Sequence, residues 1–430
     1  MKYFWNQLLF NTLRSKSGLS QVIVSVGGNA ASMTISAIAM LLISRTLEPV
    51  NFGIFSVGFA VLLILNKISD LGLTFAQLKY VPRLTSETDK NQLFSYIVRT
   101  KLLISLAIAV VGTICTPLLA TLLDFPYHSI LYLGFWLNVL TVLYEQLMAM
   151  LQSLHRFSEA AVSGVIQAMG KLVSAIAIGI VFPKSVVLAF ISYAVAPILP
   201  VFFSKTLLPK STRLSAQLAK NTDHKVIASM AGHSAIGFIS LGIIDNIDIL
   251  FVQRYLNDFE TGLLGGSSKI AMLFSLSAYA LSTVLNSRVA RYRQKSHIYA
   301  FIKKGVMLSF AVLVGYLLLI PFSSQIIYYS IGPAYSESSE ILKILLAASF
   351  LSIITVPFAA IFFSFKKAEW YFSVGGIMQV GIIVLGNAVL VPMFGLAGSA
   401  WTRVAAKSVF LVFTIVTASL YLRSIHSEKR

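Results

Sequence analysis

The sequence is poor in the residues that soluble proteins and redox or metal sites depend on. Its 430 residues include a single cysteine, Cys115, which excludes an intrachain disulfide and a metal site built from cysteines. Only 12% of the residues are charged while 57% are hydrophobic, so a soluble fold of this length would lack polar surface. Among the charged residues the acids are the minority, with 16 Asp and Glu against 34 Lys and Arg. The composition predicts a basic membrane protein.

Motifs for catalysis and nucleotide use are also missing. No GxxxxGK[ST] phosphate loop is present, no Ser, His and Asp arrangement suggests a nucleophile, and no His, Asp or Glu set has metal-ligand spacing. We therefore expect no catalytic residues, no metal, no cofactor and no direct use of ATP. The net charge of +18 could suit nucleic acid, but the basic residues lie beside apolar runs. Membrane orientation and contact with anionic membrane lipid explain them better, so no nucleic-acid partner is expected.

Long apolar runs dominate the chain. A helix rises 1.5 Å per residue, so crossing a hydrocarbon core of about 30 Å takes roughly 20 residues. Twelve runs meet this length, which predicts an all-α polytopic membrane protein. The predicted spans are 21–44, 51–73, 102–123, 130–153, 160–182, 185–203, 226–251, 261–285, 306–329, 341–363, 368–391 and 396–421.

The connections between these runs are alternately rich and poor in basic residues. One side collects 25 of the 34 Lys and Arg residues, Lys101 among them. The other side has only Arg45, Lys184, Arg254 and Lys343. Because positively charged connections stay in the cytoplasm, both termini are predicted to be cytoplasmic.

A polar stretch at 205–225 divides the spans into an N-terminal lobe (1–204), a cytoplasmic linker (205–225) and a C-terminal lobe (226–430). The halves share a pattern: Arg45, Leu47 and Gly53 recur 209 residues later as Arg254, Leu256 and Gly262. Each half has an even number of spans, so the repeat is parallel and its two-fold axis runs along the membrane normal. We expect two six-helix lobes facing each other across a cleft, as alternating access requires.

Several segments resemble one family of exporters. The run from Ser44 to Gly53 resembles its R-x-L-G-P-x-x-F-G signature, with Glu48 in the place of the usual glycine, a loop change expected to be harmless. The DLGL run from Asp70, the segment from Asp248 to Lys269, Gly332 to Tyr335 and the run 391–398 resemble later parts of the family pattern. The chain thus resembles, over nearly its whole length, the polysaccharide branch of the multidrug/oligosaccharidyl-lipid/polysaccharide (MOP) exporter superfamily.

The resemblance implies a MATE-like fold and a function similar to that of O-antigen (Wzx-type) flippases. Such proteins are not enzymes; they move undecaprenyl-diphosphate-linked oligosaccharide across the bacterial inner membrane by alternating access. A polysaccharide polymerase and a chain-length regulator are the protein partners that it implies. Ion counter-transport or the membrane potential would supply the energy.

Five cations lie inside predicted spans, where each needs a partner or a hydrated cavity. Arg403 and Lys407, spaced i,i+4 on one helix face, would suit the diphosphate of a lipid carrier. The alternative is that Arg403 reaches outward while Lys407 pairs with an acid. Lys171 and Lys269 complete the candidate substrate-binding set, although each could instead form a structural ion pair.

Acids inside or beside the spans are candidates for ion coupling or structural pairs. Asp245 and Asp248 are predicted to lie at the depth of Lys269 and to pair with it, with a coupling-ion or substrate site as the alternative. Lys67 and Asp70 are expected to pair with each other or to reach the interface. Glu145 is a second candidate partner for Lys67 and a candidate proton-coupling carboxylate.

Three rival functions stay open on the sequence. A cation-coupled multidrug antiporter of the same superfamily would need acids to dominate its cavity. A flippase for the peptidoglycan precursor is chemically closer. A membrane glycosyltransferase or polymerase would need a catalytic carboxylate or large outer loops, whereas the connections here are short.

Overall fold

The computed structural model describes residues 18–210, 212, 224–289, 295–364 and 369–424, and every regular element in these ranges is helical. Residues 1–17 and most of the predicted linker at 205–225 lie outside the described residues. The first half contains α2 (Gly18–Asp70), α3 (Leu73–Tyr80), η1 (Val81–Arg83), α4 (Glu87–Leu123), α5 (His128–Ser153), α6 (Phe157–Val181), α7 (Val186–Val195), α8 (Ile198–Phe202) and α9 (Ser204–Leu207).

The second half contains α10 (His224–Tyr255), α11 (Asp258–Val289), α12 (Lys295–Leu319), η2 (Ile320–Phe322), α13 (Ser323–Ser330), η3 (Pro333–Ser338), α14 (Ser339–Ala359), η4 (Ala360–Ser364) and α15 (Glu369–Ser424). Among the described residues, eight helices are long and apolar enough to cross a membrane, with α2 and α15 counted once each.

The helices α2 and α15 each cover two predicted spans. In α2 the helical dihedrals break at Glu48, just before Pro49, and in α15 they break at Gly395. The sixth predicted span divides into α7 and α8 beside Pro197, and the ninth into α12 and α13 around Pro321. Proline interrupts helices because it lacks an amide hydrogen and its ring clashes with the preceding turn. The helices therefore follow the twelve predicted spans.

The break at Glu48 gives a structural reason for the glycine that the signature usually has at this position. Glu48 adopts φ 60° and ψ 170°, a conformation that is essentially restricted to glycine. A side chain in this region costs about 1–3 kcal/mol. The position is therefore a bend between two helices rather than the expected loop, and the harmlessness of the departure stays a prediction.

The chain forms two compact units. The first contains residues 1–40, 65–116 and 129–235, and the second contains 41–64, 117–128 and 236–430. In the first, α6 packs against α7 and α8, and a buried core includes Leu73, Phe94 and Met150. The units differ from the predicted lobes, since 41–64 and 117–128 pack within the second unit. The lobe boundaries at 204 and 226 stay a prediction about the sequence repeat.

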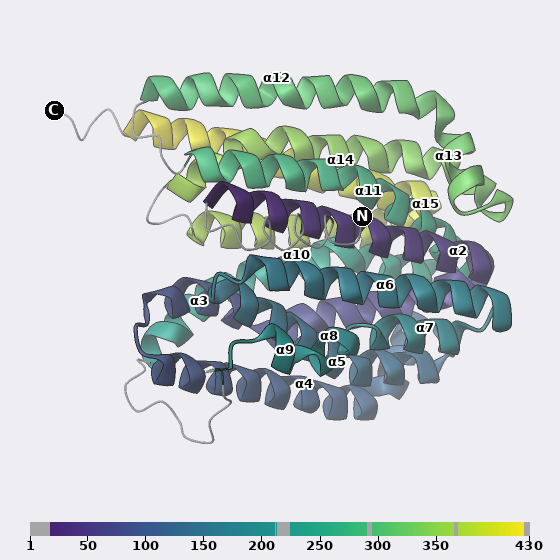
Figure 1. Ribbon diagram of the computed structural model, residues 1–430. Helices are drawn as coiled ribbons and strands as arrows, with labels where there is room; N and C mark the ends of the chain where they lie inside the picture. The colour runs from purple at the N-terminus through teal and green to yellow at the C-terminus, as the bar shows by residue number, and fades with distance from the viewer. Residues whose placement is uncertain (1–17, 211, 213–223, 290–294, 365–368, 425–430) are drawn as a thin grey trace, which may run out of the picture. The chain divides into compact units, whose positions relative to one another are not determined.

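In the second unit α14 packs against α11, α12 and α15 (Figure 1). Aromatic rings fill part of its core, where Tyr371 stacks on Phe362 with ring centroids 3.9 Å apart and on Phe413 at 5.5 Å. The Tyr371 hydroxyl is satisfied by Thr414 at 2.6 Å. A buried phenol retains a partner in this way because an unpaired polar group is costly in an apolar core.

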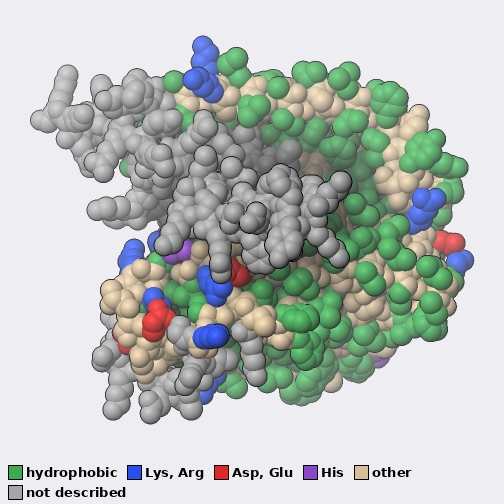
Figure 2. Space-filling model, viewed as in Figure 1, with side chains coloured by type: hydrophobic (Ala, Val, Ile, Leu, Met, Phe, Trp, Pro, Cys, Tyr) green, Lys and Arg blue, Asp and Glu red, His purple; other side chains and the backbone are tan. Residues whose placement is uncertain are grey.

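Hydrophobic side chains cover most of the described surface in the view of Figure 2. Ile114 and Ile180, on α4 and α6, have 73% and 76% of their surface exposed. Exposed apolar surface on this scale is typical of helices that contact lipid. The chain is a multi-pass membrane protein.

Candidate functional site

Five charged residues predicted from the sequence meet in the second unit. We call them the C-terminal charge cluster: Asp245 and Asp248 on α10, Lys269 on α11, and Arg403 and Lys407 on α15. Each helix contributes its charges to one face, because residues three or four apart lie one above the other. The cluster has three cations and two carboxylates, so one positive charge is in excess.

Arg403 and Asp248 form the central ion pair of this cluster. The Arg403 Nη2 donates to Asp248 Oδ2 and also lies 3.5 Å from the backbone oxygen of Asp245. Asp248 is buried, and its Oδ1 accepts a hydrogen bond from the Ile249 amide at 3.0 Å. Arg403 therefore does not reach outward, which was the alternative considered from the sequence. Its charge is largely balanced by a neighbouring helix.

Lys269 was predicted to pair with Asp245 or Asp248, and this prediction was wrong. In the part of the chain that the structure describes, Lys269 forms no ion pair, and its Nζ lies 5.2 Å from the centre of the Phe59 ring. It still interacts electrostatically with Arg403 and with both aspartates. Because Arg403 pairs directly with Asp248, Lys269 interacts instead with the π face of the Phe59 ring.

Lys407 lies one turn beyond Arg403 on α15 and is half-buried. Within the described ranges it forms no ion pair, although Asp245 interacts with it electrostatically. The alternative in which Lys407 is locked onto an acid is thus not what the structure has. Lys407 and Lys269 are the two cations of the cluster that have no direct carboxylate partner among the described residues. Such ammonium groups can hold an anion as point charges.

Lys171, the fourth predicted cavity cation, belongs to the first unit. It is half-buried on α6, and its Nζ lies 4.5 Å from the centre of the Tyr193 ring on α7. A cation over an aromatic ring is a stabilising arrangement that needs no acid. The contact differs from the ion pair that was the sequence alternative, and the substrate-binding role of Lys171 stays a prediction.

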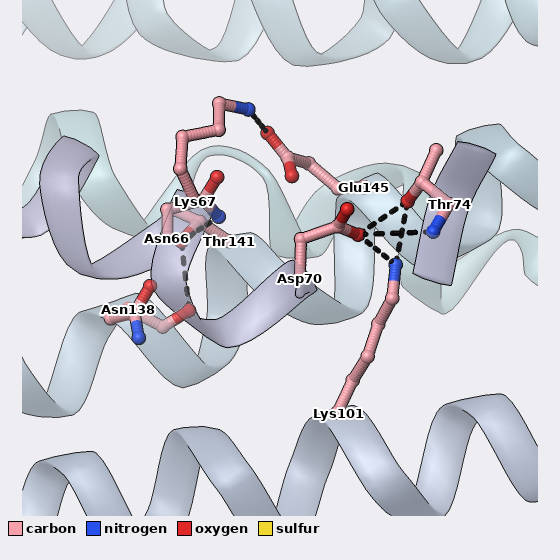
Figure 3. Close-up of polar contacts among 8 residues, drawn as sticks. All are labelled: Asn66, Lys67, Asp70, Thr74, Lys101, Asn138, Thr141 and Glu145. Atoms are coloured by element: carbon pink, nitrogen blue, oxygen red, sulfur yellow. Dashed lines mark hydrogen bonds and ion pairs between the residues drawn. The ribbon is translucent and has the colours of Figure 1, made fainter. Parts of the chain in front are cut away.

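A second set of contacts contains the remaining predicted charges, Lys67, Asp70 and Glu145. We call it the N-terminal polar network (Figure 3). Lys67 Nζ is 3.0 Å from Glu145 Oε1 on α5, and both side chains are about one third exposed. Lys67 and Asp70 do not pair with each other, so that prediction was wrong, while the alternative pairing of Lys67 with Glu145 is confirmed. Although three residues apart on α2, the two side chains reach different neighbouring helices.

Asp70 pairs instead with Lys101, which sequence reasoning had counted among the cytoplasmic connections. Lys101 Nζ lies 2.5 Å from Asp70 Oδ1, and the two side chains are 1% and 9% exposed. Thr74 completes the group: its hydroxyl lies 2.7 Å from Lys101 and 2.5 Å from Asp70. The available signal was position, since Lys101 directly precedes the third apolar run and Asp70 lies near the end of the second.

Amide side chains extend this network between α2 or α3 and α5. Asn138 donates to the Ser69 hydroxyl at 2.9 Å, and Gln146 donates to Gln77 at 2.7 Å. All four side chains are buried. Buried hydrogen bonds of this kind fix how helices dock because each unmet polar group costs about 1–3 kcal/mol. The network is balanced in charge, whereas the C-terminal charge cluster is not.

Comparison with known proteins identifies both a family and a fold. Residues 19–285 match the family described as "Polysaccharide biosynthesis protein". No curated protein sequence matches the chain. Among solved structures, that of the "Lipid II flippase MurJ, inward closed conformation" has a TM-score of 0.74 at 14% identity, covering 92% of this chain and 87% of that one.

Two transporters of the MOP superfamily are also similar in structure. An inward-facing multidrug resistance MATE transporter has a TM-score of 0.68 at 14% identity, covering 94% of this chain and 99% of that one. A MOP superfamily transporter from Pyrococcus furiosus, described as having a binding pocket of reverse polarity, has a TM-score of 0.60 at 15% identity, covering 96% of this chain and 98% of that one. At these identities the likeness shows the fold, which is that of the MOP superfamily.

Proposed function

Because this chain belongs to the polysaccharide biosynthesis protein family, we propose that it is a flippase that moves a lipid-linked oligosaccharide across the bacterial cytoplasmic membrane. The proposed substrate carries its glycan, such as an O-antigen repeat unit, on undecaprenyl diphosphate. The protein binds, reorients and releases this molecule without covalent chemistry, and its termini lie in the cytoplasm. A polymerase and a chain-length regulator would act on the delivered product.

The observation that carries the proposal is the positive excess in the C-terminal charge cluster. A diphosphate has several anionic oxygens, and the ammonium groups of Lys269 and Lys407 are available beside the Arg403–Asp248 pair. A charge-assisted hydrogen bond to a phosphate is about twice as strong as a neutral one. The headgroup and glycan would occupy the polar interior while the polyprenyl chain stays in lipid, where burial of its methylene groups stabilises it.

Alternating access would carry the headgroup from the inner to the outer face, driven by ion counter-transport or by the membrane potential. A cation-coupled multidrug antiporter is disfavoured because its cargo is cationic and the described cluster has more cations than acids. A flippase for the peptidoglycan precursor shares the diphosphate chemistry. The likeness to the MurJ structure favours it only at the level of the fold.

The proposal is tested in proteoliposomes with a fluorescent polyprenyl-diphosphate oligosaccharide and, in a parallel arm, fluorescent lipid II. Lys269→Gln and Lys407→Gln each remove one charge, and Lys304→Gln, at an exposed position on α12, is the matched control. A hydrogen bond to a charged group contributes about 1.5–3 kcal/mol, so each cluster variant should bind inorganic pyrophosphate roughly tenfold to a hundredfold more weakly.

Translocation should fall in the same two variants and stay normal in the control. If both cluster variants translocate substrate as fast as Lys304→Gln, the cluster is not the diphosphate site. Faster movement of lipid II than of the oligosaccharide carrier would replace the proposed substrate with the peptidoglycan precursor.

A further inference from the structure

Two glycines of the repeated signature make reciprocal contacts in the second unit. We call residues 44–56 the first elbow and residues 253–265 the second elbow. A Cβ added to Gly53 would lie 1.9 Å from the backbone oxygen of Asp258, and one added to Gly262 would lie 1.8 Å from that of Pro49. Pro49 and Asp258 are separated by the same 209 residues as Gly53 and Gly262. Gly53 therefore packs against Asp258, which is the repeat counterpart of Pro49, and Gly262 packs against Pro49 itself.

A third contact locates the symmetry axis. A Cβ added to Gly265 would lie 2.6 Å from the Ser56 hydroxyl, and these two positions are again 209 residues apart. In a two-fold interface a residue meets its own counterpart only on the axis. The axis of the internal repeat thus passes between Ser56 and Gly265, where the elbows cross.

Two tyrosines brace the crossing, one from each half. The Tyr335 hydroxyl donates to the backbone oxygen of Ser44 at 2.7 Å, and that of Tyr127 donates to Asp258 Oδ2 at 3.3 Å. Tyr127 follows the third predicted span and contacts the second elbow. Tyr335 follows the ninth predicted span and contacts the first elbow. Tyr335 and Ser44 are fully buried, so this side of the crossing is closed to water.

We infer that the crossing is the closed outer gate of the transporter, which opens by separating the two elbows at Gly53 and Gly262. The inference rests on the proposed orientation and on the alternating access of the proposed function. Backbone packed against backbone has no side chain that can turn aside, so the contact is either complete or lost. Such an interface has two states and suits a gate. Among the described residues, the contacts that must break are the van der Waals packing, the two tyrosine hydrogen bonds and a long hydrogen bond of 3.4 Å from Arg45 Nη1 to the backbone oxygen of Tyr329.

The test measures access to a buried reporter from outside intact cells. In a Cys115→Ser background, which removes the only native cysteine, Ser44→Cys places one thiol in the first elbow. The rate of labelling by a membrane-impermeant maleimide is compared for Gly53→Ala, Gly262→Ala and the control Gly315→Ala. At Gly315 an added Cβ meets no described atom within 4 Å.

The added methyl groups at Gly53 and Gly262 should hold the elbows apart and raise the labelling rate at least tenfold, while Gly315→Ala stays at the parent rate. Equal rates in all four proteins would overturn the gate. So would acceleration seen only from the cytoplasmic side, in inverted vesicles. If the glycine variants fail to fold, Tyr335→Phe and Tyr127→Phe decide, since each removes one hydroxyl and should raise labelling several-fold.

The labelling assay contains no substrate, so its outcome is independent of the diphosphate site. Failure of Lys407→Gln to affect pyrophosphate binding, together with accelerated labelling of Gly53→Ala, would reject the proposed substrate site and retain the gate. The opposite combination would reject the gate alone.

Discussion

Loss of either member of the Asp70–Lys101 pair alone should strongly destabilise the first unit. Asp70 receives Lys101 at 2.5 Å, and the two side chains are 9% and 1% exposed. Asp70→Asn leaves a buried ammonium without its carboxylate, and Lys101→Met leaves the carboxylate with only the hydroxyl and amide of Thr74. Removing one member of a buried pair costs about 3–5 kcal/mol.

Removing both members should cost far less than the sum of the two single changes. The double variant Asp70→Asn with Lys101→Met buries no unpaired charge, and replacing a whole buried pair by neutral groups of similar volume is often close to neutral. The coupling free energy of the double-mutant cycle should therefore be about 2–4 kcal/mol or more, since residues in contact do not contribute additively.

The assay is thermal unfolding in detergent, followed by intrinsic fluorescence. For a unit of about 200 residues, 1 kcal/mol corresponds to about 2–4 °C, so each single variant should lower the Tm by roughly 10 °C. The control is Glu87→Gln with Lys90→Met, an ion pair on the same helix whose acid is 55% exposed. An exposed pair contributes only about 0–1 kcal/mol.

Additive effects of Asp70→Asn and Lys101→Met would refute the reasoning, because they would mean that the two charges do not stabilise each other. Single variants no less stable than the Glu87/Lys90 control would refute it equally.

Three further predictions concern single positions. The Glu48→Gly variant should have an unfolding free energy about 1 kcal/mol higher than Glu48→Ala, and therefore a higher Tm, because only glycine adopts the dihedral angles of the bend without strain. Equal values for the two variants would show that the backbone at this position is unstrained. Asp248→Asn should tighten pyrophosphate binding measured by calorimetry, since it frees Arg403 from its internal carboxylate; unchanged affinity would exclude Arg403 from the anion site. Lys171→Gln should lower the unfolding free energy by about 0.5–2 kcal/mol through loss of the contact with Tyr193, and Tyr193→Leu should match it; a translocation defect without that loss would make Lys171 a substrate ligand.

Local sequence was sufficient to predict the spans. Hydrophobic length determines whether a helix can cross the bilayer, and in lipid each span must satisfy its backbone within its own helix. The boundaries at Glu48 and Gly395 also fell between predicted spans, because Pro49 and glycine mark sites where the backbone leaves helical geometry. The conformational demand at Glu48 was missed, since a sequence does not display its φ angles.

Partner choice among the embedded charges was predictable only in part. Arg403 and Lys407 were placed together because four residues separate them on one helix. The same reasoning failed for Lys67 and Asp70, whose side chains meet Glu145 and Lys101 from different helices. It failed again for Lys269, since Arg403 takes the carboxylate that Lys269 was expected to bind.

The sequence by itself thus determined the properties that depend on neighbours along the chain: the helical spans, the excess of positive charge and the 209-residue repeat. Tertiary structure alone decided which charge neutralises which, that Lys101 is buried, and that Gly53 and Gly262 pack against the backbone of Asp258 and Pro49. The physical reason is range. Helix formation and membrane insertion act over one or two turns, whereas ion pairing and backbone contact depend on helices that lie far apart in the chain.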